Sequence, residues 1–325
     1  MEKSFRVKPL DYSVVLDNIV EGTSVYLAKN KIQAMVIGIS GGIDSTVVSA
    51  ICRMVSDKIG IPLIGLSLPC NTNADDEKSA AALVGEEFCD EFQEINIEPF
   101  FETVEKMCTT TSGLESTAIS QGNIKARLRM ISLYDIASKR RGIVMGTSNK
   151  TEWLTGFWSL HGDTGDINPI GELWKTEVYG LTKYMLEHVF KGSKALEASA
   201  KLIPTDGNGV SKSDMDQIMP GYTYNEIDHV LSTWDNLADN IKPKYAADSL
   251  TESIKNTVFD CEDEDVKARR KETCAKYGAE FKPTLGDLYG VDSVRKVIMR
   301  SIGTEFKRKN LEVCVDLDGK GIITH

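Results

Sequence analysis

Short apolar runs alternate along the first half of the chain with longer stretches whose apolar residues recur at helical spacing. Four short runs predict buried strands, at Ala34–Ser40, Ile61–Pro69, 92–97 and Arg141–Ser148. The intervening stretches, such as STVVSAICRMV, DDEKSAAALVGEEF and NIKARLRMISLYDIASKR, predict helices. This alternation indicates an α/β fold, a doubly wound parallel sheet with helices on both faces. In such sheets, ligands bind beyond the carboxyl ends of the strands.

The alternation of strands and helices ends at about Leu250. Residues Asp260–Glu272 form a mixed run of acidic and basic side chains, which is typical of a solvated helix or a mobile segment. We therefore expect a core at residues 1–235, a helical or mobile charged insertion at 236–292 and a C-terminal segment at 293–325. The last two would form a mostly helical appendage.

The charge balance argues against a nucleic-acid-binding protein. The chain has 38 basic and 48 acidic residues, a net charge of −10, whereas electrostatic binding to nucleic acid requires a clustered basic excess. The N-terminus lacks the pattern of a signal peptide, and no apolar run approaches the roughly 20 residues that cross a bilayer. We expect a cytoplasmic protein that binds neither nucleic acid nor membrane. The seven cysteines include no C-x-x-C pair, so reduced thiols are expected rather than a zinc site.

The loop Ser40–Ser45, with the sequence SGGIDS, has the residues of a phosphate-binding turn. It precedes a predicted helix, whose first N–H groups are unpaired and carry a partial positive charge. Its glycines let the backbone approach an anion closely, and the hydroxyls of Ser40, Ser45 and Thr46 add donors. The loop matches neither G-x-x-x-x-G-K-[ST] nor G-x-G-x-x-G. We predict a phosphate cradle of another kind, with a ligand-free tight turn of small residues as the alternative.

Asp44 favours the cradle over the simple turn. A carboxylate inside an anion cradle would repel phosphates unless a cation lies between them, and Mg²⁺ held by one or two carboxylates plus substrate phosphates is the usual solution. The loop resembles the SGGxDS pyrophosphate loop of the N-type ATP pyrophosphatases, which include NAD, GMP, asparagine and argininosuccinate synthetases. The resemblance implies an adenine nucleotide alpha hydrolase-like fold that cleaves ATP between its α and β phosphates to adenylate a substrate.

Three further stretches resemble the ammonia-dependent NAD synthetases. Residues Gly122–Met130, GNIKARLRM, are similar to the GN(I/V)KAR(T/L)RM segment of that family. Residues Gly146–Val178 look like its long active-site stretch, and Lys201–Gly209 with Gly221–Asp228 look like two shorter motifs. The resemblance implies a ligase that forms a carbon–nitrogen bond. Such an enzyme amidates deamido-NAD (nicotinate adenine dinucleotide) to NAD through an acyl-adenylate, with ATP as co-substrate, and releases AMP and pyrophosphate.

Carried over residue by residue, the resemblance implies a role for each matching position. Mg²⁺ would be held by Asp44 and Glu152, and deamido-NAD by Arg127 and Asp166. ATP would be bound by Gly38, Ile39, Ser40, Gly41, Gly42, Ile43, Asp44, Ser45, Thr147, Lys175 and Thr205.

The C-terminal segment would return to the substrate site. There SIGTEFKRK looks like the HKR segment of the family, which implies that Phe306 and Lys307 bind deamido-NAD. Two positions depart from the family pattern. Phe306 stands where histidine is commoner. Leu160 stands where many bacterial members carry a lysine, so a positive charge is lost there, and His161 is the nearest residue that could replace it.

The expected chemistry gives catalytic roles to Lys175 and Asp163. A carboxylate becomes a good acyl donor when AMP is transferred to it, and Mg²⁺ with Lys175 would stabilise the departing pyrophosphate. Ammonium must then bind and lose a proton, for which Asp163 is the candidate base by resemblance and chemistry. The alternative for Asp163 is a turn residue beside Gly162. No glutaminase module fits beside this core, so free ammonia is expected unless a separate subunit supplies it.

Two other functions stay open at this point. The chain could be another N-type amide or thio synthetase, such as a GMP synthetase ATPase subunit, or a nucleotide-binding homologue that has lost catalysis. The resemblance also implies a homodimer with substrate sites at or near the interface. The helix predicted at NIKARLRMISLYDIASKR carries the apolar residues Ile124, Leu128, Met130 and Ile131. Together they form a wider apolar surface than the single stripe by which a helix packs on a sheet. A second subunit or the C-terminal appendage would cover the excess.

Overall fold

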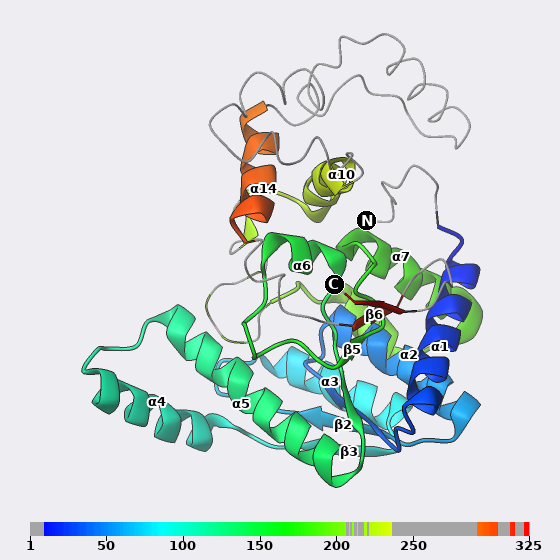
Figure 1. Cartoon of the computed structure of the whole chain (residues 1–325), viewed down its shortest axis with the longest axis horizontal. Helices are drawn as coiled ribbons and strands as arrows, with labels where there is room; N and C mark the ends of the chain where they lie inside the picture. Colours follow the sequence, from blue (N-terminus) through cyan, green and yellow to red (C-terminus); the bar gives the residue numbers. More distant parts are fainter. Residues whose placement is uncertain are drawn as a thin grey trace.

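Seven strands form one sheet in the part of the chain that the computed structural model describes, which comprises residues 10–205, 208, 210, 213, 218–219, 221–235, 291–304, 313–315 and 322–324 (Figure 1). The strand order is β3-β2-β1-β4-β5-β6-β7, and every neighbouring pair is parallel except β6 and β7. The strands are β1 (Met35–Gly38), β2 (Leu63–Ser67), β3 (Glu91–Glu94), β4 (Ile143–Met145), β5 (Ile167–Asn168), β6 (Val313–Val315) and β7 (Ile322–Thr324). The predicted doubly wound parallel α/β sheet is confirmed.

Helices follow most of the strands, as the apolar spacing predicts. No helix in the described residues is long and apolar enough to cross a membrane. The helices are α1 (Tyr12–Lys29), α2 (Ile43–Ile59), α3 (Asp75–Phe88), α4 (Glu98–Ser112), α5 (Ala118–Lys139), α6 (Lys150–Thr155), α7 (Lys175–Tyr184) continued by the π-helical turn η1 (Met185–Val189), α8 (Lys194–Lys201), α10 (Tyr224–Asp235) and α14 (Val291–Gly303).

Side chains of the central strands alternate between two cores, one on each face of the sheet. Met35 and Ile37 of β1 point into the larger core, which is built with residues of α1, α2, α3, α7 and α8. Val36, between them, points to the opposite face and packs with Met130 and Leu133 of α5. Successive side chains of a strand point to opposite faces, so both faces of β1 must be covered. The helices on both faces confirm this expectation.

The C-terminal strands were not predicted from the sequence. Strand β6 pairs in parallel with β5, and β7 pairs with β6 in the antiparallel direction, so that a hairpin forms the edge of the sheet. Each of these strands has three residues. Three residues are too few to show the alternation of apolar and polar side chains that marks a strand, so the sequence pattern did not predict β6 or β7.

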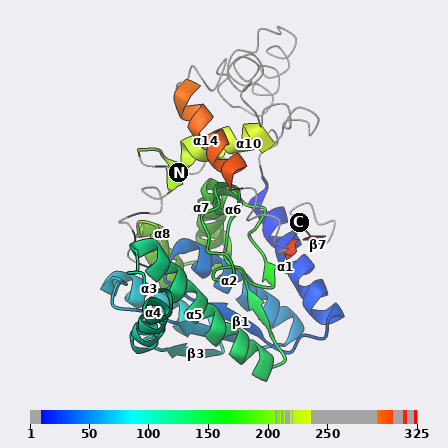
Figure 2. The same cartoon turned by 60° about the vertical axis from the view of Figure 1, so that its left-hand side comes forward.

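A smaller third core joins α10 and α14. Their buried residues Tyr224, Ile227, Val297 and Ile298 pack together with Trp174, which precedes α7. Helix α10 contacts α6 and α7, α14 contacts α6, and both lie on the side of the molecule away from β3 (Figure 2). The predicted insertion at residues 236–292 lies outside the described residues, except for the first two residues of α14.

The strand order places a crevice between β1 and β4. From β1 the chain runs outward through β2 and β3 and then returns to β4 on the other side of β1. The chain therefore leaves β1 toward β2 on one side and leaves β4 toward β5 on the other, and this reversal leaves a crevice outside the carboxyl ends of β1 and β4. The loop Ser40–Ser45 follows β1 and residues Gly146–Thr147 follow β4, so the strand order alone brings two of the predicted ATP-binding segments together.

Candidate active site

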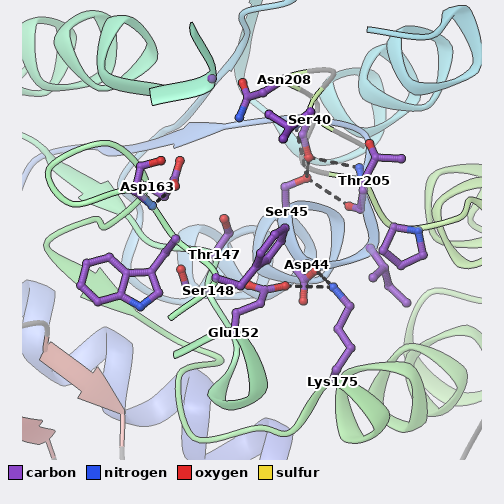
Figure 3. Close-up of a pocket in the computed structure, with 18 of the residues that line it drawn as sticks. Ser40, Asp44, Ser45, Thr147, Ser148, Glu152, Asp163, Lys175, Thr205 and Asn208 are labelled. Carbon is purple, nitrogen blue, oxygen red and sulfur yellow. Dashed lines mark hydrogen bonds and ion pairs between the residues drawn. The ribbon is translucent and has the colours of Figure 1, made fainter. Parts of the chain in front are cut away.

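A cavity of about 550 Å³ lies in the crevice beyond β1 and β4. Its wall comes from segments far apart in the sequence: the loop after β1, the first turn of α2, the loop after β4, α6 and the loop that follows it, the first residue of α7, and residues 202–205. Figure 3 shows side chains from all of these segments pointing into one space. Most of the predicted ATP-binding residues are thus brought together.

The loop after β1 has the shape of an anion cradle. Ser40 and Ser45 are joined through their hydroxyl oxygens at 3.1 Å, and the N–H of Gly42 donates to Ser40 Oγ at 3.2 Å. Gly42 is the N-cap of α2, and no side chain of the described residues caps this helix. The first N–H groups of α2 therefore face the cavity without an internal acceptor, with the positive end of the helix dipole behind them.

Gly41 is required by the path of this loop. Its φ is +85°, in the left-handed region that favours glycine. A Cβ atom at this position would lie 2.2 Å from the backbone carbonyl oxygen of Glu77 in α3. Any other residue would therefore push the loop away from α3, and the cradle would lose its shape.

The centre of the cavity holds a buried lysine between two carboxylates. Lys175 Nζ forms ion pairs with Asp44 Oδ2 and with Glu152 Oε1, the latter at 3.1 Å (Figure 3). The side chain of Lys175 is 1% exposed, against 16% for Asp44 and 12% for Glu152. Asn149 donates to the other oxygen of Asp44 at 2.9 Å. The ring of Tyr224 lies 5.5 Å from the ammonium, so a cation–π contact completes its surroundings.

Each of these three charges lies in the first turn of a helix. Asp44 is in the first turn of α2, Glu152 in that of α6, and Lys175 is the first residue of α7. The helix dipole stabilises a carboxylate at this end and destabilises a cation. Lys175 therefore depends on its two carboxylate partners, and all three helix starts are held together by the ion pairs.

The pair of carboxylates fits Mg²⁺ only in the presence of a phosphate ligand. In the described part of the chain, no group of three or more His, Cys, Asp or Glu residues is arranged to hold a metal by itself, and Cys52, Cys70, Cys89 and Cys108 are free thiols. Asp44 and Glu152 lie on one wall of the cavity, beside the cradle. Mg²⁺ commonly takes one or two protein carboxylates and completes its shell with phosphate oxygens and water, so the residues present fit such an ion.

A buried aspartate fixes the starts of α6 and α7. Asp228 of α10 is fully buried and accepts hydrogen bonds from the hydroxyl of Thr151 and from the N–H of Thr176, the latter at 2.8 Å. Thr151 Oγ1 in turn accepts from the N–H of Lys175 at 2.9 Å. Burial raises the pKa of Asp228 to about 7, although the bonds from Thr151 and Thr176 act in the opposite direction. This network sets the spacing between α6, which carries Glu152, and α7, which carries Lys175.

Three other predicted site residues line the cavity. Thr147 follows β4, and Thr205 donates through its hydroxyl to Glu77 of α3. Asp163 is exposed to the cavity and accepts a hydrogen bond from the N–H of Ser159. In Figure 3, Asp163 lies on the other side of the cavity from Lys175.

The predicted substrate-binding residues lie elsewhere. Arg127 is exposed on α5, and its guanidinium donates to the carbonyl oxygen of Leu160 at 3.2 and 3.1 Å. Asp166 accepts from the N–H of Val144 at 2.8 Å and from the hydroxyl of Tyr134 at 3.1 Å. Neither residue lines the cavity. Phe306 and Lys307 lie outside the described residues.

Several wall residues were missed by the sequence analysis. Asn208, within the motif Lys201–Gly209, accepts from Arg129 Nη1 at 2.6 Å. Arg129 also donates to the carbonyl oxygen of Leu68 at 3.0 Å. These residues border a smaller cavity of about 180 Å³ at the carboxyl ends of β1 and β2. Arg300 of α14 reaches the larger cavity. No motif pointed to it, because it lies 125 residues beyond Lys175 in a segment where only residues 301–309 matched a pattern.

Comparison with known proteins shows the family of this chain. Residues 15–262 match the family model for NAD synthase. The NH₃-dependent NAD⁺ synthetase of Chlorobium phaeobacteroides is 32% identical over 229 residues, which cover 68% of this chain and 74% of the relative. That of Thermoplasma acidophilum is 34% identical, over 65% of this chain and 81% of the relative.

Two solved structures are also similar to this chain. The NMN synthetase of Francisella tularensis has a TM-score of 0.59 and 28% identity, and the match covers 73% of this chain and 92% of that one. The NH₃-dependent NAD synthetase of Campylobacter jejuni has a TM-score of 0.55 over 84% of this chain and 99% of that one. At 24% identity the second match shows the shared fold alone.

We predict that Asp228→Asn changes how the stability of the chain depends on pH. The pKa of Asp228 is raised from 3.8 to about 7 by folding, so the folded state binds this proton more tightly than the unfolded state does. The contribution of Asp228 to the free energy of unfolding is then largest at acid pH and is lost as the pH rises through about 7. Urea denaturation at several pH values should show the stability of the parent, relative to the variant, falling between about pH 4 and pH 8.

The matched control is Asp235→Asn at the end of the same helix, where the carboxylate is partly exposed and pairs with Lys150 at 2.7 Å. It should show no such fall. A difference between parent and Asp228→Asn that stays constant over this pH range would contradict the raised pKa.

Proposed function

This chain belongs to the NAD synthase family, and we propose that the cavity between β1 and β4 is where it performs the reaction of that family. The chain is a ligase that forms a carbon–nitrogen bond and uses ATP as co-substrate. It amidates deamido-NAD to NAD through an acyl-adenylate, with ammonia as the nitrogen donor, and releases AMP and pyrophosphate. The family match disfavours a GMP synthetase or a thio synthetase.

One observation carries the assignment of the site: a buried lysine bridges two carboxylates next to an uncapped helix start. A binding module without catalysis has no need for this arrangement, because a fully buried ammonium and two carboxylates are expensive to desolvate. A reaction that separates pyrophosphate from AMP does need it. Lys175 provides a fixed positive charge where negative charge develops on the leaving group, and it requires no reorganisation at that moment.

The phosphates of ATP are proposed to occupy the cradle. The N–H groups of Gly42 and of the first turn of α2 would donate to them, and Ser40 and Ser45 add hydroxyl donors. The adjoining cavity of about 180 Å³ lies beside the cradle, and its apolar residues Leu66, Leu68 and Met130 would pack against the adenine ring. Mg²⁺ bound by Asp44 and Glu152 would neutralise phosphate charge. Thr147 and Thr205, which also line the cavity, would contact the nucleotide as well.

The amide-forming step is assigned to Asp163. Its carboxylate is exposed to the cavity, and its Oδ2 is held by the N–H of Ser159. An oriented carboxylate attracts ammonium and accepts a proton from it, which leaves neutral ammonia beside the acyl-adenylate. We propose free ammonia as the nitrogen source and the cytosol as the place of reaction.

A homodimer is proposed to complete the substrate site. Helices α4 and α5 lie side by side (Figure 1). The two helices and the loop between them expose apolar residues, among them Leu114 of the loop (72%) and Ile119 (68%) and Ile131 (65%) of α5. Burial of such a surface favours association. Of the four apolar residues that suggested a second face on α5, Met130 is buried against the sheet, and only Ile131 is classed as exposed. Arg127 lies on the same helix, so deamido-NAD would reach Arg127 and Asp166 near the interface.

The purified chain is predicted to form pyrophosphate and NAD from ATP, deamido-NAD and ammonium, and to stop when Mg²⁺ is chelated. Asp44→Asn and Glu152→Gln should each lower the rate of pyrophosphate formation by about 10²-fold or more, since each removes a charge that holds Lys175 and the metal. Because one similar structure is an NMN synthetase, nicotinate mononucleotide is assayed beside deamido-NAD.

The control variant is Asp75→Asn, which changes the solvent-exposed first residue of α3 and should behave like the parent. Near-normal rates in both site variants would rule out the proposed metal pair.

The second prediction separates the two chemical steps. Asp163→Asn should form pyrophosphate at close to the parental rate but transfer ammonia about 10²–10⁴-fold more slowly, because the variant cannot accept a proton from ammonium. Hydroxylamine, a neutral nucleophile at neutral pH, should restore product formation as the hydroxamate. If ammonia transfer in the variant equals that of the parent at each ammonium concentration, Asp163 is a turn residue only.

The third prediction concerns assembly. Light scattering should give twice the 35.9 kDa mass of one chain for the parent. Ile131→Asp should shift the protein toward the monomer, because it places a charge in the proposed apolar interface. Val25→Asp on α1 is the control, since Val25 is also exposed (54%) but lies on the opposite face of the sheet. A parental monomer that still makes NAD would exclude the dimer as a requirement.

A further inference from the structure

Arg300, on the C-terminal helix α14, reaches the cavity and has no role in the chemistry described above. Its Nε donates to the carbonyl oxygen of Thr155, the last residue of α6, at 2.8 Å. Four residues further on, Thr304 Oγ1 donates to the carbonyl oxygen of Leu154 at 3.2 Å. Thr304 also packs against Gly156, where an added Cβ would lie 2.5 Å from Thr304 Cβ. Helix α14 is thus fastened to the end of α6, and Arg300 is held at the cavity wall.

Within the described residues, the charges of the cavity wall leave Arg300 without a counterion. Among the described residues that line the cavity, the carboxylates are Asp44, Glu77, Glu152 and Asp163, and the cations are Lys175 and Arg300. Lys175 is bound by two of these carboxylates, whereas Arg300 forms no ion pair within the described residues. Arg300 is partly buried, and this burial lowers the pKa of its guanidinium, which nevertheless stays charged. An anionic ligand would compensate the lost hydration of this cation.

The position of Arg300 separates it from the phosphates of ATP. Lys175 meets Glu152 in the first turn of α6, whereas Arg300 bonds to its last residue. Phe157, which follows α6, also lines the cavity and packs against the small core to which α14 contributes Val297 and Ile298. This part of the wall therefore offers an aromatic surface and a guanidinium. An aromatic carboxylate has the complementary chemistry, because a guanidinium binds a carboxylate through two parallel N–H donors.

We propose that Arg300 binds the carboxylate of the pyridine ring of deamido-NAD and so distinguishes the acid substrate from the amide product. The proposal rests on the proposed function and adds a substrate-binding residue that the sequence motifs do not contain. Before the reaction the contact is a charge-assisted hydrogen bond, and after amidation the ring carries a neutral amide. The same side chain would therefore hold the substrate firmly and let the product leave.

The test is a comparison of two ligands that share every group except this one. Titration calorimetry measures the Kd of deamido-NAD and of NAD for the parent, R300Q and R300K, with an ATP analogue present that cannot be cleaved between its α and β phosphates. R300Q should raise the Kd of deamido-NAD about 10–100-fold, the usual range for a hydrogen bond to a charged group, and change that of NAD by less than about threefold. R300K should lie between the parent and R300Q, because it keeps the charge but not the planar pair of donors.

Lys296 provides the matched control, since it is exposed on the same helix about one turn before Arg300. K296Q should bind both ligands as the parent does. Equal weakening of deamido-NAD and NAD in R300Q would overturn the proposal and assign Arg300 to the diphosphate that both ligands carry. If R300Q binds both ligands as the parent does but has a lower melting temperature, Arg300 only caps the end of α6 and does not bind the substrate. If the parent makes no NAD, the proposed function itself fails; if it makes NAD and R300Q binds both ligands normally, only the role of Arg300 fails.

Discussion

The arrangement of the active site depends on the burial of one ammonium group. Lys175 is 1% exposed at the start of α7, where the helix dipole disfavours a cation. The two carboxylates that offset this cost come from α2 and α6, so the ion pairs join three helix starts at one point. None of the three side chains can move alone without leaving a buried charge unpaired. The cavity is therefore rigid where pyrophosphate is proposed to leave, as electrostatic stabilisation of a transition state requires.

The sheet topology makes this meeting possible. Strands β1 and β4 are neighbours in the sheet, although two strands and four helices lie between them along the chain. Because the two strands are parallel, their carboxyl ends, at Gly38 and Met145, lie side by side. The chain leaves β1 through the cradle into α2 and leaves β4 toward α6. Asp44 consequently reaches the crevice from the segment that follows β1, and Glu152 reaches it from the segment that follows the neighbouring strand β4.

The sequence predicted the parts of the site that depend on local pattern. The apolar run before SGGIDS, together with the glycines and hydroxyls of that loop, predicts the cradle. The structure shows why Gly41 must be glycine. The carboxylate of Asp44 points to a cation partner. The structure adds that this partner includes Lys175 itself. The family segment gave Arg127 a role in substrate binding, which stays a prediction, and the structure adds that its guanidinium donates to the backbone carbonyl oxygen of Leu160. The contacts of Asp228 and Arg300 join residues 52 to 145 positions apart, and no local period records such pairs.

The two ends of the cavity are built by different parts of the chain. The phosphate end is formed by the parallel sheet and the starts of α2, α6 and α7, whereas the other end is closed by α14, which packs with α10 in a separate small core. Helix α10 also supports the phosphate end from behind, because Asp228 fixes the starts of α6 and α7 and Tyr224 faces the ammonium of Lys175. A shift of the small core would therefore act on both ends at once: it would move Arg300 in the wall and loosen the spacing between Glu152 and Lys175. The end proposed to bind the pyridine carboxylate and the end proposed to bind pyrophosphate are therefore coupled through this small core.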